Sequence, residues 1–258
     1  MAEGLKVVAA ALDAGVPIES VYLAAEGRTS GAVEDLAGRA FERGARVFEL
    51  GPGLMERVAD TVSPQPICAV VQMNDRPLAD LLLPSGDRPG EGRVILVCVD
   101  VRDPGNLGAV LRSAAAAGTA GVVCCDGCAD VFNPKAVRAS AGAVFHVPVA
   151  RGGDAGTVLP SFREAGWRLL GTSARAGTSY LEADLAGDVA LVLGNEASGL
   201  PGELDALMDG VVTVPMATAS ESLNVAMTAT ILVFEIARRR GEVFDSKASE
   251  GVRPAHLA

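Results

Sequence analysis

Val94-Ile-Leu-Val-Cys-Val99 is a continuous apolar run in which most side chains are branched at the β-carbon. Such a run is typical of a central strand that is covered by helices on both faces. It is followed by Asp103-Pro-Gly-Asn-Leu-Gly108, a polar turn that leads into an expected helix over 107–117, ended by Gly118. Together the two segments predict an α/β domain with a parallel sheet.

The same alternation continues towards the C-terminus. Strands are expected at 121–125, 144–147, 168–172, 189–193 and 211–214, with helical segments between most of them. The last helix has an apolar stripe from Leu223 to Phe234, and it ends in three arginines and Gly241.

The first third of the chain predicts a smaller α/β unit. Helices are expected from Leu5 to Leu12, over 32–43 and over 53–62, and strands over 16–23, 45–49 and 67–72. The Pro- and Gly-rich stretch after Leu83 is typical of a linker. The expected organisation is therefore an N-terminal domain over 1–83, a linker over 84–92, a catalytic domain over 93–244 and a tail over 245–258.

Composition limits the class of protein. The chain has 258 residues, of which 49% are hydrophobic and 21% charged, as expected for a packed globular protein. It has no apolar run near the roughly 18 residues of a membrane span and no signal peptide at its start, so we expect a cytoplasmic protein without a membrane partner. Five cysteines without regular spacing argue against a disulfide framework, and packing is favoured over metal binding for Cys124, Cys125 and Cys128.

The net charge of −10 excludes a uniformly basic surface for wrapping nucleic acid. Any RNA binding must be local, and the arginines and lysines gather in two places. The first group is Arg28, Arg39, Arg43, Arg46 and Arg57, and the second is Lys135 and Arg138. From charge alone, these residues are equally consistent with solvated helix faces paired with Glu34, Asp35 and Glu42.

Three polar loops each follow a buried strand, which is where open α/β sheets bind ligands. The first carries Asn106 and leads to Arg112. The second, Leu193-Gly-Asn-Glu-Ala-Ser-Gly-Leu200, combines two glycines with an acid. The third presents Ser220, Ser222 and Asn224 before the last helix, where they can cap the helix, bind ligand or do both. Each loop alone is weak support, because such residues are usually caps or turns.

No G-x-G-x-x-G or G-x-x-x-x-G-K-[ST] segment is present, which disfavours an ordinary dinucleotide or triphosphate enzyme. Taken together and in this order, the loops resemble the motifs of the SpoU (TrmH) family of the SPOUT superfamily of methyltransferases. The matching stretches are Asp103 to Ser113, Leu193 to Leu200, Val214-Pro-Met216 and Ser222 to Ala226, and Phe132 to Gly142 is similar to a fourth family segment. The first domain resembles the family's substrate-binding extension more loosely.

The resemblance implies a SPOUT domain with a deep trefoil knot, S-adenosylmethionine as methyl donor, and a homodimer. It also implies that the smaller N-terminal domain has a ribosomal-protein-like, RNA-binding fold. Without the resemblance, a knot would be a poor guess. The cofactor-binding residues carried over by the resemblance are Thr172, Leu193, Gly194, Glu196, Val214, Met216, Ser222, Leu223 and Ala226.

The expected reaction is methylation of a ribose 2'-hydroxyl in RNA, without a metal. The resemblance makes Arg112 the proton acceptor, yet a guanidinium is normally protonated far above neutral pH. We therefore expect Arg112 either to have strongly altered acidity or to contact the hydroxyl or phosphate of the target nucleotide. The expected catalytic set is Asn106, Arg112, Glu196, Ser222 and Asn224, and the expected RNA contacts are Arg28, Lys135, Arg138 and Ser140, although Arg138 is equally consistent with an ion pair to Asp130.

The sequence favours one class of RNA as the substrate without identifying the nucleotide. A separate N-terminal domain favours 23S ribosomal RNA over transfer RNA, since enzymes of this family use both. Two other classes stay open: a catalytically silent RNA-binding or assembly protein of the same fold, and a different nucleotide-using α/β enzyme. The complete catalytic set disfavours the first, and the missing phosphate loops disfavour the second.

Overall fold

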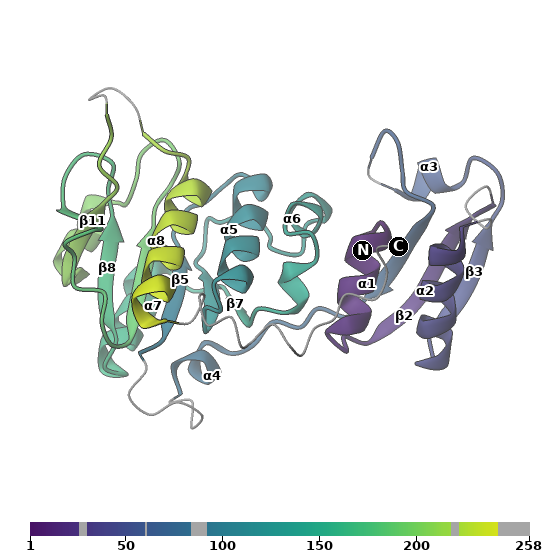
Figure 1. The fold of residues 1–258 in the computed structure, drawn as a ribbon, viewed down its shortest axis with the longest axis horizontal. Helices are drawn as coiled ribbons and strands as arrows, with labels where there is room; N and C mark the ends of the chain where they lie inside the picture. Colours follow the sequence, from purple (N-terminus) through teal and green to yellow (C-terminus); the bar gives the residue numbers. More distant parts are fainter. Residues whose placement is uncertain (26–29, 60, 84–91, 218–221, 242–258) are drawn as a thin grey trace.

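The computed structural model describes residues 1–25, 30–59, 61–83, 92–217 and 222–241. They form two lobes that lie side by side along the long axis of an elongated molecule (Figure 1). The expected tail, Arg28, Ser220 and all of the expected linker except Gly92 lie outside the described residues.

The first lobe contains a mixed four-stranded sheet in the order β1-β4-β2-β3. β2 runs parallel to β3 and antiparallel to β4, and β1 is antiparallel to β4. Helices α1 and α2 cover one face of this sheet, because their buried side chains, such as Leu12 and Leu36, belong to the same cluster as Val21 and Leu23 of β2. The elements are β1 (Ala2–Glu3), α1 (Leu5–Asp13), β2 (Ile18–Ala24), α2 (Gly31–Glu42), β3 (Arg46–Leu50), α3 (Met55–Val58) and β4 (Ile67–Val71).

The second lobe contains a seven-stranded sheet in the order β7-β6-β5-β10-β8-β11-β9. Every pairing in it is parallel, as the sequence predicted. β10 lies between β5 and β8, so strands far apart in sequence end beside one another. The strands are β5 (Val94–Cys98), β6 (Gly121–Cys124), β7 (Val149–Arg151), β8 (Arg168–Thr172), β9 (Thr178–Ser179), β10 (Val189–Leu193) and β11 (Gly210–Thr213).

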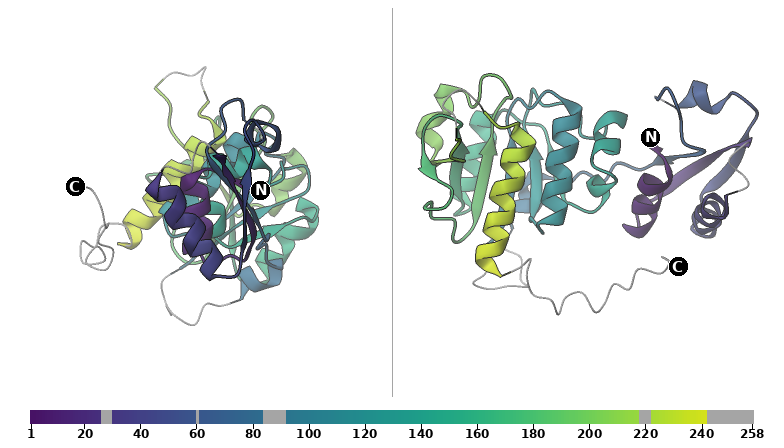
Figure 2. Two further views of the ribbon diagram at one scale, coloured as in Figure 1. Left: turned by 90° about the vertical axis from the view of Figure 1, so that its right-hand side faces the viewer. Right: turned by 45° about the horizontal axis from the view of Figure 1, so that its top comes forward.

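Helices cover both faces of this sheet. The apolar run of β5 is continuous because its side chains are buried on both faces. Leu96 and Cys98 pack in one cluster with helices α5 and α8, which stand side by side in Figures 1 and 2. Ile95 and Val97 pack in a second cluster with α7 and α4. The further elements are α4 (Leu78–Leu82), α5 (Pro104–Ala116), α6 (Pro134–Ala139), η2 (Ala143–Phe145), α7 (Ala155–Glu164), η3 (Gly202–Leu207) and α8 (Val225–Arg240).

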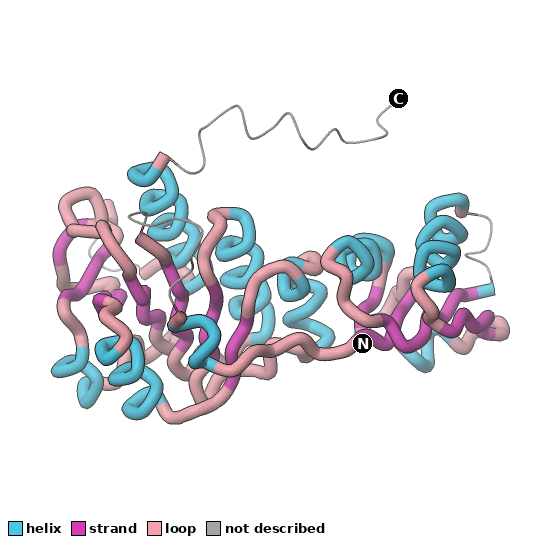
Figure 3. The backbone as a smooth tube through the Cα atoms, turned by 90° about the horizontal axis from the view of Figure 1, so that it is seen from below, coloured by secondary structure: helices cyan, strands magenta, loops and turns pink. Residues whose placement is uncertain are grey.

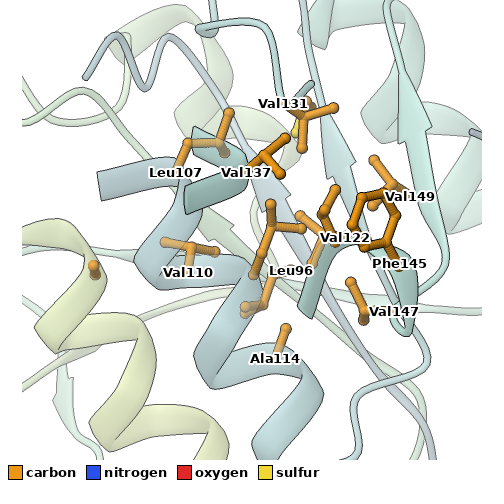
Figure 4. Packing of buried hydrophobic residues seen from close by; sticks show 14 of the residues in the cluster. Leu96, Leu107, Val110, Ala114, Val122, Val131, Val137, Phe145, Val147 and Val149 are labelled. Carbon is orange, nitrogen blue, oxygen red and sulfur yellow. The ribbon is translucent and has the colours of Figure 1, made fainter. Parts of the chain in front are cut away.

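The core beneath α5 is built from side chains of several elements (Figure 4). Leu107, Val110 and Ala114 project from α5 at helical spacing towards Leu96 and Val122 of the sheet, and all five are fully buried. Burying a leucine of this kind contributes about 1.5–3 kcal/mol to folding. The core therefore holds the N-terminus of α5, and the loop before it, against the edge of the sheet.

Two elements expected from the sequence differ in the structure. The helix expected over 53–62 is only the short α3, and a second element changes its type. The strand expected at 144–147 is the short helix η2 and its exit, and β7 begins only at Val149. Ala141 and Gly142 both have positive φ, which ends α6 and starts a tight turn, so the apolar run there packs as a turn. His146 is exposed after η2 instead of lying on a strand.

The end of the expected first domain also differs. α4 lies within residues 1–83, but its Leu81 is buried with Ile95 and Phe162 of the second lobe. Leu78, Leu81 and Leu82 form an apolar face at helical spacing that needs cover, and the seven-stranded sheet supplies it. The segment that crosses between the lobes therefore precedes α4, as the tube from β4 to α4 shows in Figure 3.

The lobes are joined by direct contacts as well as by the chain. Arg138 of α6 donates to the carboxylate of Glu3 in β1 at 3.0 Å, and the Glu3 side chain is only 3% exposed. In the segment that crosses between the lobes, the backbone amide of Arg76 donates to the carbonyl of Val149 at 2.7 Å. Among the described residues, no helix combines the length and the apolar character that crossing a membrane requires.

Candidate active site

A cavity of about 930 Å³ opens where β8, β10 and β11 end. These are neighbouring strands of the parallel sheet, and ligands of such sheets bind at the carboxyl ends of the strands. The walls come from the loops after the three strands, from η3 and from the start of α8. The lining includes Thr172 to Gly177, Gly194 to Leu200, Asp205, Met208, Val211, Val214, Met216, Ser222, Leu223, Val225 and Thr228.

The cavity suits a nucleoside-sized ligand such as S-adenosylmethionine. Its lining mixes apolar side chains such as Leu200 and Met208 with polar ones such as Ser222, which is the usual composition of a small-molecule site. At Gly194 the backbone runs so close to the facing loop that an added Cβ would overlap Gly199 and the amide nitrogen of Leu200. The loop therefore stays folded against itself, with backbone instead of side chain at that point of the cavity wall.

Most of the expected cofactor-binding residues line this cavity. They are Thr172, Gly194, Glu196, Val214, Met216, Ser222 and Leu223. Leu193 and Ala226 do not line it, because both are buried in the core behind the wall. The sequence analysis missed Ser173 to Gly177, although this loop follows β8 directly, and the strand-end rule used for the other loops would have found it.

Three residues of the expected catalytic set meet in a hydrogen-bond network. The side-chain amide of Asn106 donates to Glu196 at 2.9 Å, and that of Asn224 donates to the Asn106 carbonyl oxygen at 2.7 Å. Asn224 also caps α8, because its Oδ1 accepts from the amide of Ala226 at 2.8 Å. The two readings of Asn224, cap or site residue, are therefore compatible in one side chain.

Glu196 holds the first loop against the second. Besides Asn106, it accepts from the backbone amides of Arg102 at 3.5 Å and Asp103 at 3.3 Å. Burial acts to raise the pKa of Glu196, but these hydrogen bonds outweigh burial and lower it. The carboxylate is thus stabilised as an anion that accepts hydrogen bonds.

Asp103 continues the network to α6. It caps α5 by accepting from the amide of Asn106 at 2.8 Å, and it pairs with Lys135 at 3.0 Å. The hydrogen bond from Lys135, followed by that from the Asn106 amide, lowers the pKa of Asp103. Lys135 is still exposed, so its ammonium group lies beside the network and within reach of a bound anion.

Arg112 and Ser222 lie outside the hydrogen-bond network. Ser222 lines the cavity two residues before Asn224. Arg112 is exposed on α5, roughly 9 Å along the helix axis from Asn106. Within the described parts of the chain it makes no hydrogen bond or ion pair. The next residue, Ser113, is 2.6 Å from Thr230 of α8, so Arg112 stands beside the contact between these helices.

The expected RNA contacts separate into different environments. Arg28 lies outside the described residues. Arg138 pairs with Glu3 at 3.0 Å. Ser140 is 1% exposed and donates to the carbonyl of Val137, so the structure does not place it where RNA can reach it.

Two arginines of the basic group in the first lobe are paired with acids. Arg39 lies 2.5 Å from Asp13, and Arg46 lies 2.6 Å from Glu19. Two of the cysteines that were considered as metal ligands, Cys124 and Cys125, are buried. Desolvation raises the pKa of Cys125 to about 12, which keeps it as a neutral thiol.

Comparison with known proteins identifies related sequences over both lobes. Residues 93–234 match the SpoU rRNA Methylase family, and residues 1–77 match the domain described as RNA 2'-O ribose methyltransferase substrate binding. The chain is 36% identical over 199 residues to the 23S rRNA (guanosine(2553)-2'-O)-methyltransferase RlmP of Bacillus subtilis, covering 76% of this chain and 74% of that protein.

Solved structures are similar over nearly the whole chain. The AdoMet-bound rRNA methyltransferase from Sinorhizobium meliloti superposes with a TM-score of 0.79 at 32% identity, covering 92% of this chain and 86% of that one. The AdoMet complex of the SpoU methyltransferase AviRb from Streptomyces viridochromogenes gives a TM-score of 0.77 at 28% identity, with coverage of 92% and 89%.

Proposed function

Since this chain belongs to the SpoU rRNA methylase family and is an RNA ribose 2'-O-methyltransferase that uses S-adenosylmethionine, we propose that its substrate is 23S ribosomal RNA. The relative from Bacillus subtilis is named for that RNA. The observation that carries the proposed site is the network of Asn106, Glu196 and Asn224 at the wall of the cavity. Membership of this family disfavours both alternative classes, a catalytically silent RNA-binding protein and an unrelated nucleotide-using enzyme.

We propose that the chain's own residues act by positioning and by charge. S-adenosylmethionine supplies a methyl group on a sulfonium centre, which a nucleophile attacks in line. Asn106 and Asn224 hold the loops in the geometry in which a ribose hydroxyl faces the cavity, and Ser222 lines the cavity beside them. Arg112, an exposed cation on the helix that carries Asn106, contacts the hydroxyl or phosphate of the target nucleotide. Lys135 is placed to bind a neighbouring phosphate.

The RNA class is tested by methyl transfer from labelled S-adenosylmethionine to undermethylated total RNA, followed by separation of ribosomal from transfer RNA. We expect label in 23S ribosomal RNA. Fragments of that RNA are then used to locate the nucleotide. Label confined to transfer RNA contradicts the proposed substrate and leaves the proposed roles of the residues standing.

We further propose that the protein is a homodimer in which the exposed side of α8 is covered. Met227 is 59% exposed in the first turn of α8, and Ile231 and Phe234 follow at helical spacing as partly buried apolar residues. Light scattering should give twice the chain mass of 26.3 kDa. Met227→Glu should shift the mass towards one chain, whereas a wild-type protein that already has the mass of one chain contradicts the dimer. The trefoil knot stays a prediction of the family resemblance.

A further inference from the structure

The four-stranded sheet of the first lobe has a second face, opposite α1 and α2, that carries two aromatic rings. Side chains alternate along β2, so Val21 and Leu23 point to the helices and Tyr22 points to the other face. Tyr22 pairs in register with Phe48 of β3. Their rings are stacked, with centroids 5.4 Å apart and planes inclined by 20°.

The ring pair is only partly covered by the protein. Met55 of α3 packs with Ala24 and Cys68 at one end of this face, and Tyr22 lies against that small cluster. Phe48, on the edge strand, remains 41% exposed. The chain has only seven phenylalanines and two tyrosines, so two of its few rings meet on a face where water reaches them.

A cation lies beside the rings. The guanidinium carbon of Arg46 is 5.8 Å from the centroid of Phe48, and the Arg46 side chain is 63% exposed. Its carboxylate partner Glu19 is 64% exposed, so the pair is at the surface and solvent weakens it. A phosphate group can therefore approach Arg46 without displacing a buried partner.

The net charge of −10 makes general electrostatic attraction a poor source of RNA affinity. Stacking of bases on aromatic rings works without a basic surface, because every base has a flat apolar face. The chain's substrate is RNA, and the part of the chain that matches a substrate-binding domain includes both β2 and β3. An exposed stacked pair with an adjacent arginine has the chemistry that unpaired bases recognise.

We propose that Tyr22 and Phe48 form a stacking platform for unpaired bases of the substrate RNA, with Arg46 beside it to contact a phosphate. The inference rests on the proposed function and adds a second contact surface to it. β3 is the edge strand farthest in sheet order from β1, the strand whose Glu3 pairs with the second lobe. The platform is thus remote from the cavity, so it acts on RNA binding and not on the chemical step.

The test compares steady-state methylation of a 23S ribosomal RNA fragment by the full-length wild type, Phe48→Leu, Tyr22→Leu and the double variant. Leucine keeps an apolar side chain and removes the ring. We expect KM for RNA to rise about fivefold or more in each single variant, since one stacked base changes affinity by about five- to a hundredfold. We expect kcat and the Kd for S-adenosylmethionine to stay unchanged, and Phe48→Trp to retain a wild-type KM.

The matched control is Phe41→Leu. Phe41 is 70% exposed, more than Phe48, but it lies on α2 and so on the opposite side of the sheet. An unchanged KM in the double variant, or an equal rise in Phe41→Leu, overturns the platform. A change of molecular mass in Phe48→Leu by light scattering also overturns it, because the rings then contact a second copy of the chain.

Failure of the platform and failure of the proposed substrate are separable. Wild-type turnover on the fragment tests the substrate without any variant. If turnover is absent, the same variants are compared by fluorescence anisotropy with a labelled single-stranded RNA. Weaker binding by Phe48→Leu but not by Phe41→Leu supports the platform, and equal binding by all variants overturns it.

Discussion

Arg112→Ala should lose turnover by at least about a hundredfold while binding S-adenosylmethionine with wild-type Kd. Arg112 is exposed on α5 and is not one of the residues that line the cavity, so its loss leaves the cofactor site intact. A charged donor that acts on the reacting hydroxyl or its phosphate typically contributes a factor of this size to the rate. Single-turnover methylation with saturating RNA, together with calorimetric titration of S-adenosylmethionine, measures both quantities.

Two further variants sharpen this prediction. Arg112→Lys keeps the positive charge but not the planar pair of N–H donors. If the contact with the nucleotide is bidentate, this variant should also lose turnover. Arg163→Ala is the matched control, because Arg163 is a surface arginine of α7, which packs on the opposite face of the sheet. Wild-type turnover in Arg112→Ala would refute the assignment of this residue.

Glu196→Gln should reduce kcat about 10- to 100-fold. The substitution replaces one acceptor oxygen by an amide group in a place where Asn106 and two backbone amides all donate. Asn106 then loses its fixed orientation, and misplacement of a positioning group by about 1 Å can cost a hundredfold in rate. The measurement is kcat for RNA methylation at saturating concentrations of both substrates.

The control and the coupling test use the same assay. Glu203→Gln removes an exposed carboxylate of η3 and should leave kcat unchanged. Glu196→Gln and Asn106→Ala act on one hydrogen bond, so their effects should be far from additive in the double variant. Strict additivity would show that the two side chains act independently and would contradict the network.

The network also has a pH dependence with a defined sign. The folded protein lowers the pKa of Glu196. The stabilisation that the ionised carboxylate gives to the network is therefore fully present above the pKa of the unfolded state, and it is lost as the pH falls through the pKa of the folded state. The loss of kcat below that range should be weaker in Glu196→Gln, which has no carboxyl group at this position to titrate.

The central part of the fold was predictable from sequence because its signals are local. The β5 run is apolar throughout since both of its faces are covered, and Gly241 marks the end of α8. The start of α5 was expected at Leu107, whereas Asp103 caps the helix and α5 begins at Pro104. The run at 144–147 misled because apolar spacing does not distinguish a short strand from a buried turn. The left-handed conformation of Ala141 that directs the chain there has no signature in an alanine.

The candidate site was predictable to the extent that it lies on loops after strands. The meeting of Asn106, Glu196 and Asn224 depends on β10 inserting beside β5, a topological fact that residue spacing alone does not contain. The environments of Arg138 and Ser140 could not be predicted from the sequence either. Glu3, the partner of Arg138, comes from the other lobe, and the Ser140 hydroxyl is buried within its own turn, where it donates to the carbonyl of Val137.

The central claim is that this site places a methyl group on a ribose 2'-oxygen of RNA. It is tested most directly by digesting RNA from the methylation reaction to nucleosides and identifying the methylated product by mass spectrometry, for the wild type and Arg112→Ala. We predict a 2'-O-methylnucleoside that depends on the wild-type enzyme and is absent with Arg112→Ala. A methyl group found on a base, or the same amount of 2'-O-methylnucleoside with Arg112→Ala, would contradict the account.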